Sequence, residues 1–240
     1  MRERAFVVSA VLLAVAIVLG ARSLGAGIRD RGATRSTSIA VTGSAKKLIE
    51  SDYVIWDASV SSQQATPGAA ARQLGGWTKA VTSFLEREGV RPSELSVEPV
   101  TAAAVHKGAY GDGKIIGYSL SVAFEVRSQR VTQITAVASR GSKLLALGIP
   151  FESQPLQYVF TKLASVRLAL LAAATADALA RARVLVDATG AHLGTLRNVD
   201  VGVFQVTPPN STDVSGYGVY DTSTIQKDVT AVVNVSFALS

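Results

Sequence analysis

The chain has 240 residues, of which 48% are hydrophobic and 18% are charged, and it contains no cysteine. This length and composition exclude a disordered chain, a disulfide-held scaffold and any site built on cysteine thiolates. The formal net charge of +6 favours a nucleic-acid partner only if a folded surface carries it. Residues 1–35 alone hold six arginines against Glu3 and Asp30. The rest of the chain is therefore close to neutral, and we expect no nucleic-acid partner.

The N-terminus has the charge and hydropathy pattern of a membrane-targeting segment. Two arginines precede an uncharged, apolar run over residues 5–21. A run of roughly 17 residues is the minimum for a helix that crosses a bilayer, and the flanking basic residues stay on the cytoplasmic side. We therefore predict a transmembrane signal anchor over residues 1–28, a linker over 29–37, and an exported domain over 38–240. This topology predicts a single-pass protein of the inner (cytoplasmic) membrane. Cleavage of the segment, with release into the periplasm, is the alternative.

Strand and helix patterns alternate along residues 38–240. Apolar residues occupy every second position over 54–60 and 116–126, which is typical of half-buried strands. Thr66 followed by Pro67 marks the start of a helix that ends near Gly89. Further strands are expected at 39–43, 95–105 with an interruption at Pro99, 157–161, 196–206 and 229–239. Further helices are expected from Ser128 to Gly148 and, rich in alanine, from 162 to 189.

The order of these elements predicts the fold class. From the strand at 54–60 to the strand at 157–161 it reads βαββαβ, which is the split βαβ arrangement. We therefore expect an α+β fold with an antiparallel-rich sheet, a long alanine-rich helix and two C-terminal strands.

Two segments are candidates for an interaction surface. On the long helix, small residues allow a close approach either of the chain's own sheet, which we favour, or of a second subunit. These residues are Ala169, Ala172, Ala173, Ala176 and Ala180, and the second interpretation makes Ala173, Ala176 and Ala180 a surface for homo-oligomer formation. Residues 207–227, between the last two strands, form a long loop that carries Tyr217 and Tyr220 as candidate contact residues. A mobile loop with no partner is the alternative for that segment.

Patterns of catalytic or metal-binding residues are missing. His106 and His192 are far apart in the sequence, and neither has the spacing of a metal ligand pair. The hydrolase elbow Gly-x-Ser-x-Gly is absent, and the short Gly-x-Gly elements at 111–113 and 216–218 are better explained as turns. We therefore expect no catalytic residues, no cofactor and no metal.

Three motifs together resemble the SIMPL-domain family of exported bacterial proteins. Residues 39–45 lead through an acidic segment at 50–53 into the strand that contains Trp56. Residues 117–122 are similar to the family's Gly-Tyr strand, and the basic, alanine-rich run before 190–194 is similar to its helix with a Gly-x-x-Leu-Gly turn. Ser51 stands before Asp52, where the family usually has a proline. In this respect the chain resembles the membrane-anchored branch of the family.

The resemblance implies an exported α+β domain that assembles into ring- or channel-like oligomers, with some members linked to envelope stress. It transfers no catalytic residues. The predicted function is accordingly a membrane-anchored cell-envelope protein that self-associates and has no enzymatic activity. The alternative is a periplasmic module that binds cell-wall material or another envelope protein through residues 207–227.

Overall fold

The computed structural model describes residues 37–108, 113–212 and 215–240. The signal anchor predicted for residues 1–28 therefore lies outside the described residues. The chain divides into two compact units. Of the described residues, those within 43–177 and 201–233 make up the larger unit, and 37–42, 178–200 and 234–240 make up the smaller unit.

The first sheet has the split βαβ arrangement that the sequence predicts. Its long central strands, β2 (Tyr53–Gln64) and β5 (Ile115–Ser128), pair antiparallel along their lengths. The other elements are α2 (Pro67–Arg87), the 3-10 helix η1 (Pro92–Glu94), β3 (Leu95–Val97), β4 (Thr101–His106), β6 (Phe151–Ser153) and β7 (Gln157–Val159). β3 and β4 pair with the free edge of β5, while β6 and β7 pair with the free edge of β2, all antiparallel. The predicted α+β class is confirmed.

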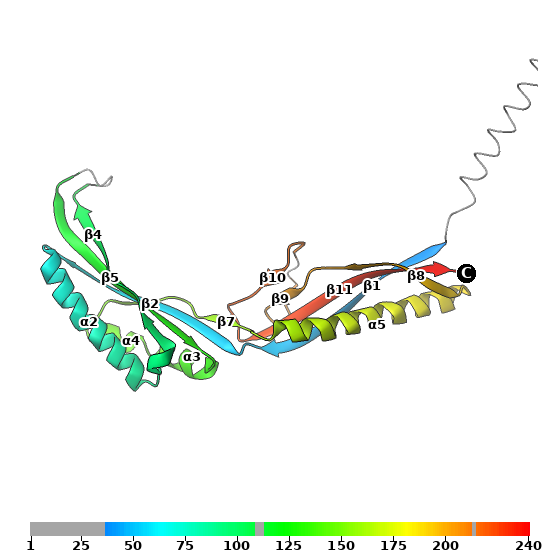
Figure 1. Cartoon of the computed structure of the whole chain (residues 1–240), viewed down its shortest axis with the longest axis horizontal. Coiled ribbons are helices and arrows are strands. Elements are labelled where there is room, and N and C mark those ends of the chain that lie inside the picture. Colours follow the sequence, from blue (N-terminus) through cyan, green and yellow to red (C-terminus); the bar gives the residue numbers. More distant parts are fainter. Residues whose placement is uncertain (1–36, 109–112, 213–214) are drawn as a thin grey trace, which may run out of the picture. The chain divides into compact units, whose positions relative to one another are not determined.

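Strict alternation of apolar residues creates the core of this sheet. Every second side chain of β2 is buried and faces α2, which packs against β2 and β5 (Figure 1). The helix begins as predicted, because the Thr66 hydroxyl accepts a hydrogen bond from the amide of Ala69 at 3.3 Å. At the centre, Trp56 donates to the Ser153 hydroxyl at 2.9 Å and meets the ring of Phe151 edge-on at 6.1 Å.

The segment after β5 differs from its prediction. Two short helices, α3 (Val131–Ser139) and α4 (Ser142–Ala146), replace the single helix expected from Ser128. Ser128 is the last residue of β5, and its hydroxyl accepts from the amide of Arg130 at 2.9 Å. The chain turns at Gly141, where a Cβ would lie 3.0 Å from the Phe151 ring. The turn buries Leu144 and leaves Leu145 56% exposed.

The second sheet has the strand order β1-β11-β9-β10, with β8 also paired to β11. Its strands are β1 (Ser38–Glu50), β8 (Leu193–Val201), β9 (Gln205–Thr207), β10 (Val219–Tyr220) and β11 (Gln226–Leu239). β1 is much longer than the strand predicted at 39–43, since its pairing with β11 continues through the polar residues after Gly43. β10 runs parallel to β9 within the segment predicted to be a loop.

The long helix α5 (Leu163–Thr189) has almost the predicted bounds. Every fourth residue from Val166 to Val186 is buried, namely Val166, Leu170, Ala174, Ala178, Ala182 and Val186. Most other positions are exposed. Among the described residues, α5 is the one helix whose length and apolar composition would allow it to cross a membrane.

Candidate functional site

The outward side of α5 is apolar and uncovered. Ala173, Ala176 and Ala180 are exposed, and so are Leu168 at 73% and Val184 at 68%. The preferred interpretation, that these alanines pack on the chain's own sheet, was wrong, because they are exposed and the buried alanines of α5 are Ala174, Ala178 and Ala182. In an isolated chain, α5 therefore presents to solvent an apolar stripe that comprises Leu168, Ala173, Ala176, Ala180 and Val184. We call this set the α5 outer stripe.

Polar contacts hold the N-terminal half of α5 in this orientation. The Asp177 carboxylate accepts from the amide of Ser44 in β1 at 2.8 Å. The Arg167 guanidinium lies 5.3 Å from the centre of the Phe204 ring, within the range of a cation–π contact. These contacts come from opposite ends of the half-helix and fix its rotation about its own axis. In this half, the outer stripe is therefore a consequence of the fold.

The strand β8 has exposed apolar side chains on both faces, together with the exposed charged residues Arg197 and Asp200. Leu196, Val199 and Val201 are all exposed, although they alternate between the faces of the strand. Among the described strands, β8 pairs only with β11, so its other edge carries free backbone donors and acceptors. An unpaired strand edge of this length is a template for pairing with another strand.

The structure separates the two tyrosines of the 207–227 segment. The Tyr220 hydroxyl accepts from the amide of Phe160 at 3.1 Å and donates to the carbonyl of the same residue at 3.3 Å. Tyr220 is thus anchored to the segment between β7 and α5. Tyr217 is 100% exposed. Of the two tyrosines, only Tyr217 has the side-chain freedom that a contact residue needs.

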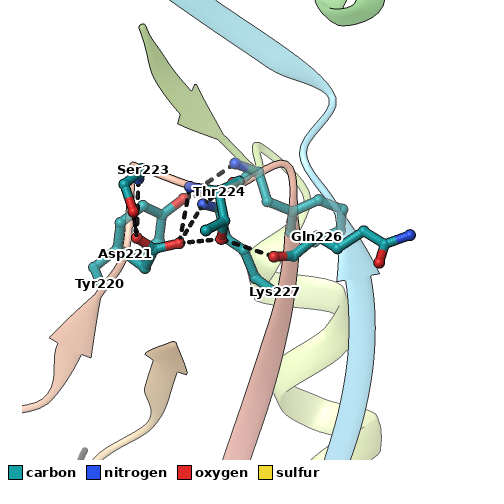
Figure 2. Close-up of polar contacts among 7 residues, drawn as sticks. Tyr220, Asp221, Ser223, Thr224, Gln226 and Lys227 are labelled. Carbon is teal, nitrogen blue, oxygen red and sulfur yellow. Dashed lines mark hydrogen bonds and ion pairs between the residues drawn. The ribbon is translucent and has the colours of Figure 1, made fainter. Parts of the chain in front are cut away.

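A buried ion pair closes the same segment, and sequence reasoning missed it. Figure 2 shows the Asp221 carboxylate surrounded by Ser223, Thr224 and Lys227. The amide and the hydroxyl of Ser223 both donate to Asp221 Oδ1, at 2.9 Å and 2.6 Å. Lys227 Nζ donates to Asp221 Oδ2 at 2.9 Å and to the carbonyl of Thr224. The lysine is 0% exposed. An aspartate followed by serine and threonine is typical of a turn in which the carboxylate accepts hydrogen bonds from the next few residues. This sequence pattern at 221–224 could have predicted the turn.

The electrostatics of this cluster point to a structural role. Burial of the carboxylate would raise the pKa of Asp221, but the hydrogen bonds from Ser223, Thr224 and Lys227 outweigh that effect. The pKa of Asp221 is therefore held far below its ordinary value, and the carboxylate keeps its charge. Because the Lys227 ammonium is wholly enclosed, no substrate reaches it without unfolding the turn.

A comparison with protein-family models identifies the chain. The model of the SIMPL family, described as a protein of unknown function (DUF541), matches residues 39–237. The chain belongs to this family. The resemblance inferred from the three motifs is confirmed. The comparison with curated proteins found no match.

Solved structures resemble parts of the SIMPL chain only weakly. The de novo designed protein Foldit4 is 14% identical and covers 42% of this chain and 93% of its own, with a TM-score of 0.24. A putative aminohydrolase from methicillin resistant Staphylococcus aureus is 14% identical, covering 51% of this chain and 32% of its own, with a TM-score of 0.23. An amidase of the hydantoinase/carbamoylase family from Burkholderia phymatum is 10% identical, covering 52% and 30%, with a TM-score of 0.25. The SIMPL chain thus spans about a third of the length of these two hydrolase structures. Likenesses at such TM-scores carry no conclusion about activity.

The two histidines of the SIMPL chain lie on separate elements. His106 is the last residue of β4, and the backbone of His192 pairs with that of Ser240 just before β8. Within residues 37–108, 113–212 and 215–240, no three His, Asp or Glu side chains gather as a metal site would require. The absence of enzymatic activity stays a prediction.

Proposed function

We propose that this SIMPL protein is a membrane-anchored cell-envelope protein that self-associates, without enzymatic activity, through the α5 outer stripe. The observation that carries the proposal is the exposure of this stripe on a helix whose opposite side is tightly packed. The anchor over residues 1–28 and the periplasmic location of the domain are parts of the same proposal, and the family resemblance supports them together with a link to envelope stress.

The stripe has the properties of an uncovered interface. From Leu168 to Val184 the stripe extends roughly 24 Å along the helix axis. Monomeric soluble proteins rarely leave large continuous apolar patches in water, because covering them releases free energy in proportion to the buried area. Three alanines at its centre allow a partner backbone to approach closely, and Leu168 and Val184 supply larger side chains at its two ends. A second copy of the chain is the simplest partner that always accompanies it.

The edge of β8 supports the same partner. Its apolar residues are exposed on both faces, and its outer backbone groups have no strand partner among the described elements. Soluble proteins normally protect such an edge by charge, by distortion or by pairing, and the charged residues of β8 are only Arg197 and Asp200. Association of copies would cover both the edge and the stripe.

A membrane is the competing occupant of the α5 outer stripe. The helix has a suitable length and hydropathy for crossing a bilayer. However, Ala174, Ala178 and Ala182 are fully buried within the protein, and Arg167 and Asp177 hold the N-terminal half of the helix beside its own chain. A charged, partly buried helix is a poor transmembrane segment. We therefore favour a protein partner.

Disulfide crosslinking tests the proposal cleanly, because the natural chain has no cysteine. The variant Ala176→Cys, expressed as the full chain in its own membrane, is expected to form a dimer on mild oxidation. The matched control is Ser83→Cys, which places an exposed thiol on α2. Equal crosslinking of the two variants, or none of Ala176→Cys over a range of expression levels, would remove the stripe as an interface.

A second variant distinguishes self-association from lipid contact. Val184→Glu adds a charge at an exposed position, so the monomer should fold normally while light scattering of the detergent-solubilised chain reports smaller particles. Ser83→Glu serves as the control. If Val184→Glu leaves particle size unchanged but weakens binding of the domain to phospholipid vesicles, the membrane is the true occupant.

A further inference from the structure

The second sheet has one polar face in the region where β9 pairs with β11. Gln205 is opposite Thr230, and Thr207 is opposite Asp228, so these four side chains share one face. The intervening pair, Val206 and Val229, is apolar and buried on the other face. From periodicity alone, these polar residues would be expected on a solvent-exposed face of the two strands.

This polar face is hollowed into a cavity of about 510 Å³. Its floor includes Gln205, Thr207 and Thr230, and the segment after β9 contributes Thr212 and Gly216 to its wall. Lys46 of β1 lines one side. The volume lies within the roughly 300–1,000 Å³ range of small-molecule sites.

One buried side chain on the floor has a polar atom without a partner among the described residues. Gln205 donates through Nε2 to the carbonyl of Ser215 at 2.7 Å, but its Oε1 is buried and accepts no hydrogen bond from any described residue. Thr207 is only 4% exposed and lines the same cavity. Buried polar atoms are almost always satisfied, so the Gln205 Oε1 atom indicates an occupant of the cavity.

The charge of the cavity defines the chemistry of that occupant. Lys46 is the one cation among the described lining residues, and its Nζ lies 3.0 Å from Asp228 Oδ2. The same carboxylate oxygen accepts from the amide of Asn210 at 3.1 Å. The lysine is therefore already neutralised and offers no net charge to an anion. What remains are hydroxyl groups and an amide oxygen, beside the apolar walls of Val203 and Val232.

We infer that this cavity binds a neutral saccharide of one or two rings. Vicinal hydroxyls both donate and accept, which matches the Gln205 acceptor and the Thr207 and Thr230 hydroxyls, while the C–H faces of a sugar ring match the valine walls. The exposed ring of Tyr217 follows Gly216 directly in the sequence, close to the cavity wall. The site is distinct from the α5 outer stripe and does not depend on self-association.

Saturation-transfer NMR on the full chain in detergent tests this site. The probes are N-acetylglucosamine, its β-1,4-linked disaccharide and maltose at millimolar concentration, with glucuronate as an anionic comparison. We expect transfer to at least one neutral sugar and at least tenfold weaker binding to Thr207→Val, which removes only the hydroxyl. Thr207→Ser restores the hydroxyl and should restore binding.

The control is Thr195→Val on β8, an exposed threonine of the same sheet that does not line the cavity. It should bind like the natural chain. Thermal unfolding of each variant establishes that a loss of binding is not a loss of fold. No transfer to any neutral probe would mean that water fills the cavity, and this result would overturn the inference. So would tighter binding of glucuronate than of the neutral sugars, or unchanged binding by Thr207→Val.

Discussion

Lys227 Nζ lies 2.9 Å from Asp221 Oδ2, and the lysine side chain is wholly buried. The amide of Asp221 also donates to the carbonyl of Val206 at 2.8 Å. The ion pair therefore joins the end of the 207–227 segment to the start of β11, next to β9. Because both charges are inside the protein, each depends on the other for its solvation.

Replacing Lys227 with methionine is expected to destabilise the protein by about 3–5 kcal/mol, since it leaves the Asp221 charge buried without its cation. Chemical denaturation of the full chain in detergent measures this change. The control is Lys47→Met, at an exposed position of β1, which should alter stability by less than about 0.5 kcal/mol. The double variant Lys227→Met with Asp221→Asn should recover part of the loss. Equal effects of the two lysine variants would show that the pair contributes nothing.

A second ion pair makes stability depend on pH. Arg130 binds both oxygens of Glu94, through Nε at 2.9 Å and through Nη2, and Ser128 donates to the same carboxylate at 2.7 Å. The hydrogen bond from Arg130, assisted by Ser128, lowers the pKa of Glu94 from 4.5 to about 2 against the effect of burial. The folded protein therefore binds this proton less readily than the unfolded chain. The contribution of the ionised Glu94 to the free energy of unfolding is complete above pH 4.5 and is lost as the pH falls towards 2.

Glu94→Gln is expected to cost about 1–3 kcal/mol near neutral pH, because a charge-assisted contact is lost. The difference between this variant and the natural chain should shrink steadily as the pH falls below 4.5. Denaturation midpoints measured at several pH values report it. Glu86→Gln, at an exposed position of α2, is the control and should follow the natural chain. A constant difference across the acid range would contradict the assignment.

Local sequence patterns predict the split βαβ sheet well, because its signals are independent of the rest of the fold. The alternation of Val54, Trp56, Ala58 and Val60 depends only on one buried face. The Thr66 cap is a contact within one turn of helix. By contrast, the turn at Gly141 depends on the approach of Phe151, which lies in a strand added later in the chain. Patterns inside residues 128–148 carry no information about that approach.

Two glycines inside α2 give a test of helix propensity. A Cβ added at Gly75 or at Gly76 would meet no atom within 4 Å. Gly75→Ala and Gly76→Ala are therefore each expected to stabilise the protein by about 0.5–1 kcal/mol through lower entropy of the unfolded chain. The contrasting variant is Gly89→Ala, where φ is +105° and alanine is strained. Thermal unfolding should show an increase in Tm for the first two and a decrease for the third. A decrease at Gly75 or Gly76 would mean that this face of α2 has a partner.

The packing face of α5 was not predictable from periodicity, for a geometric reason. Its buried residues recur at intervals of exactly four, from Val166 to Val186. Each such step advances about 40° beyond a full turn, so the buried line winds roughly 200° around the helix. The buried line and the outer stripe opposite it wind around the helix together, so neither keeps the fixed angle that a periodic pattern reveals, and an alanine-rich helix offers little contrast between them. The bounds of the helix were predictable because they depend on composition and on Gly190, not on its partners.

Two matched substitutions distinguish the buried line of α5 from its outer stripe. Ala178 is fully buried, while Ala176 belongs to the outer stripe. Ala178→Leu forces extra methyl groups into a packed contact and is expected to cost about 1–3 kcal/mol, whereas Ala176→Leu should change stability by less than about 0.5 kcal/mol. Both variants are compared by chemical denaturation in the Val184→Glu background, so that association does not contribute to the measured free energy of unfolding. Because both substitutions add the same atoms to the same helix, helix propensity cancels between them. A larger loss for Ala176→Leu would mean that the outer stripe, not the line through Ala178, packs within the protein.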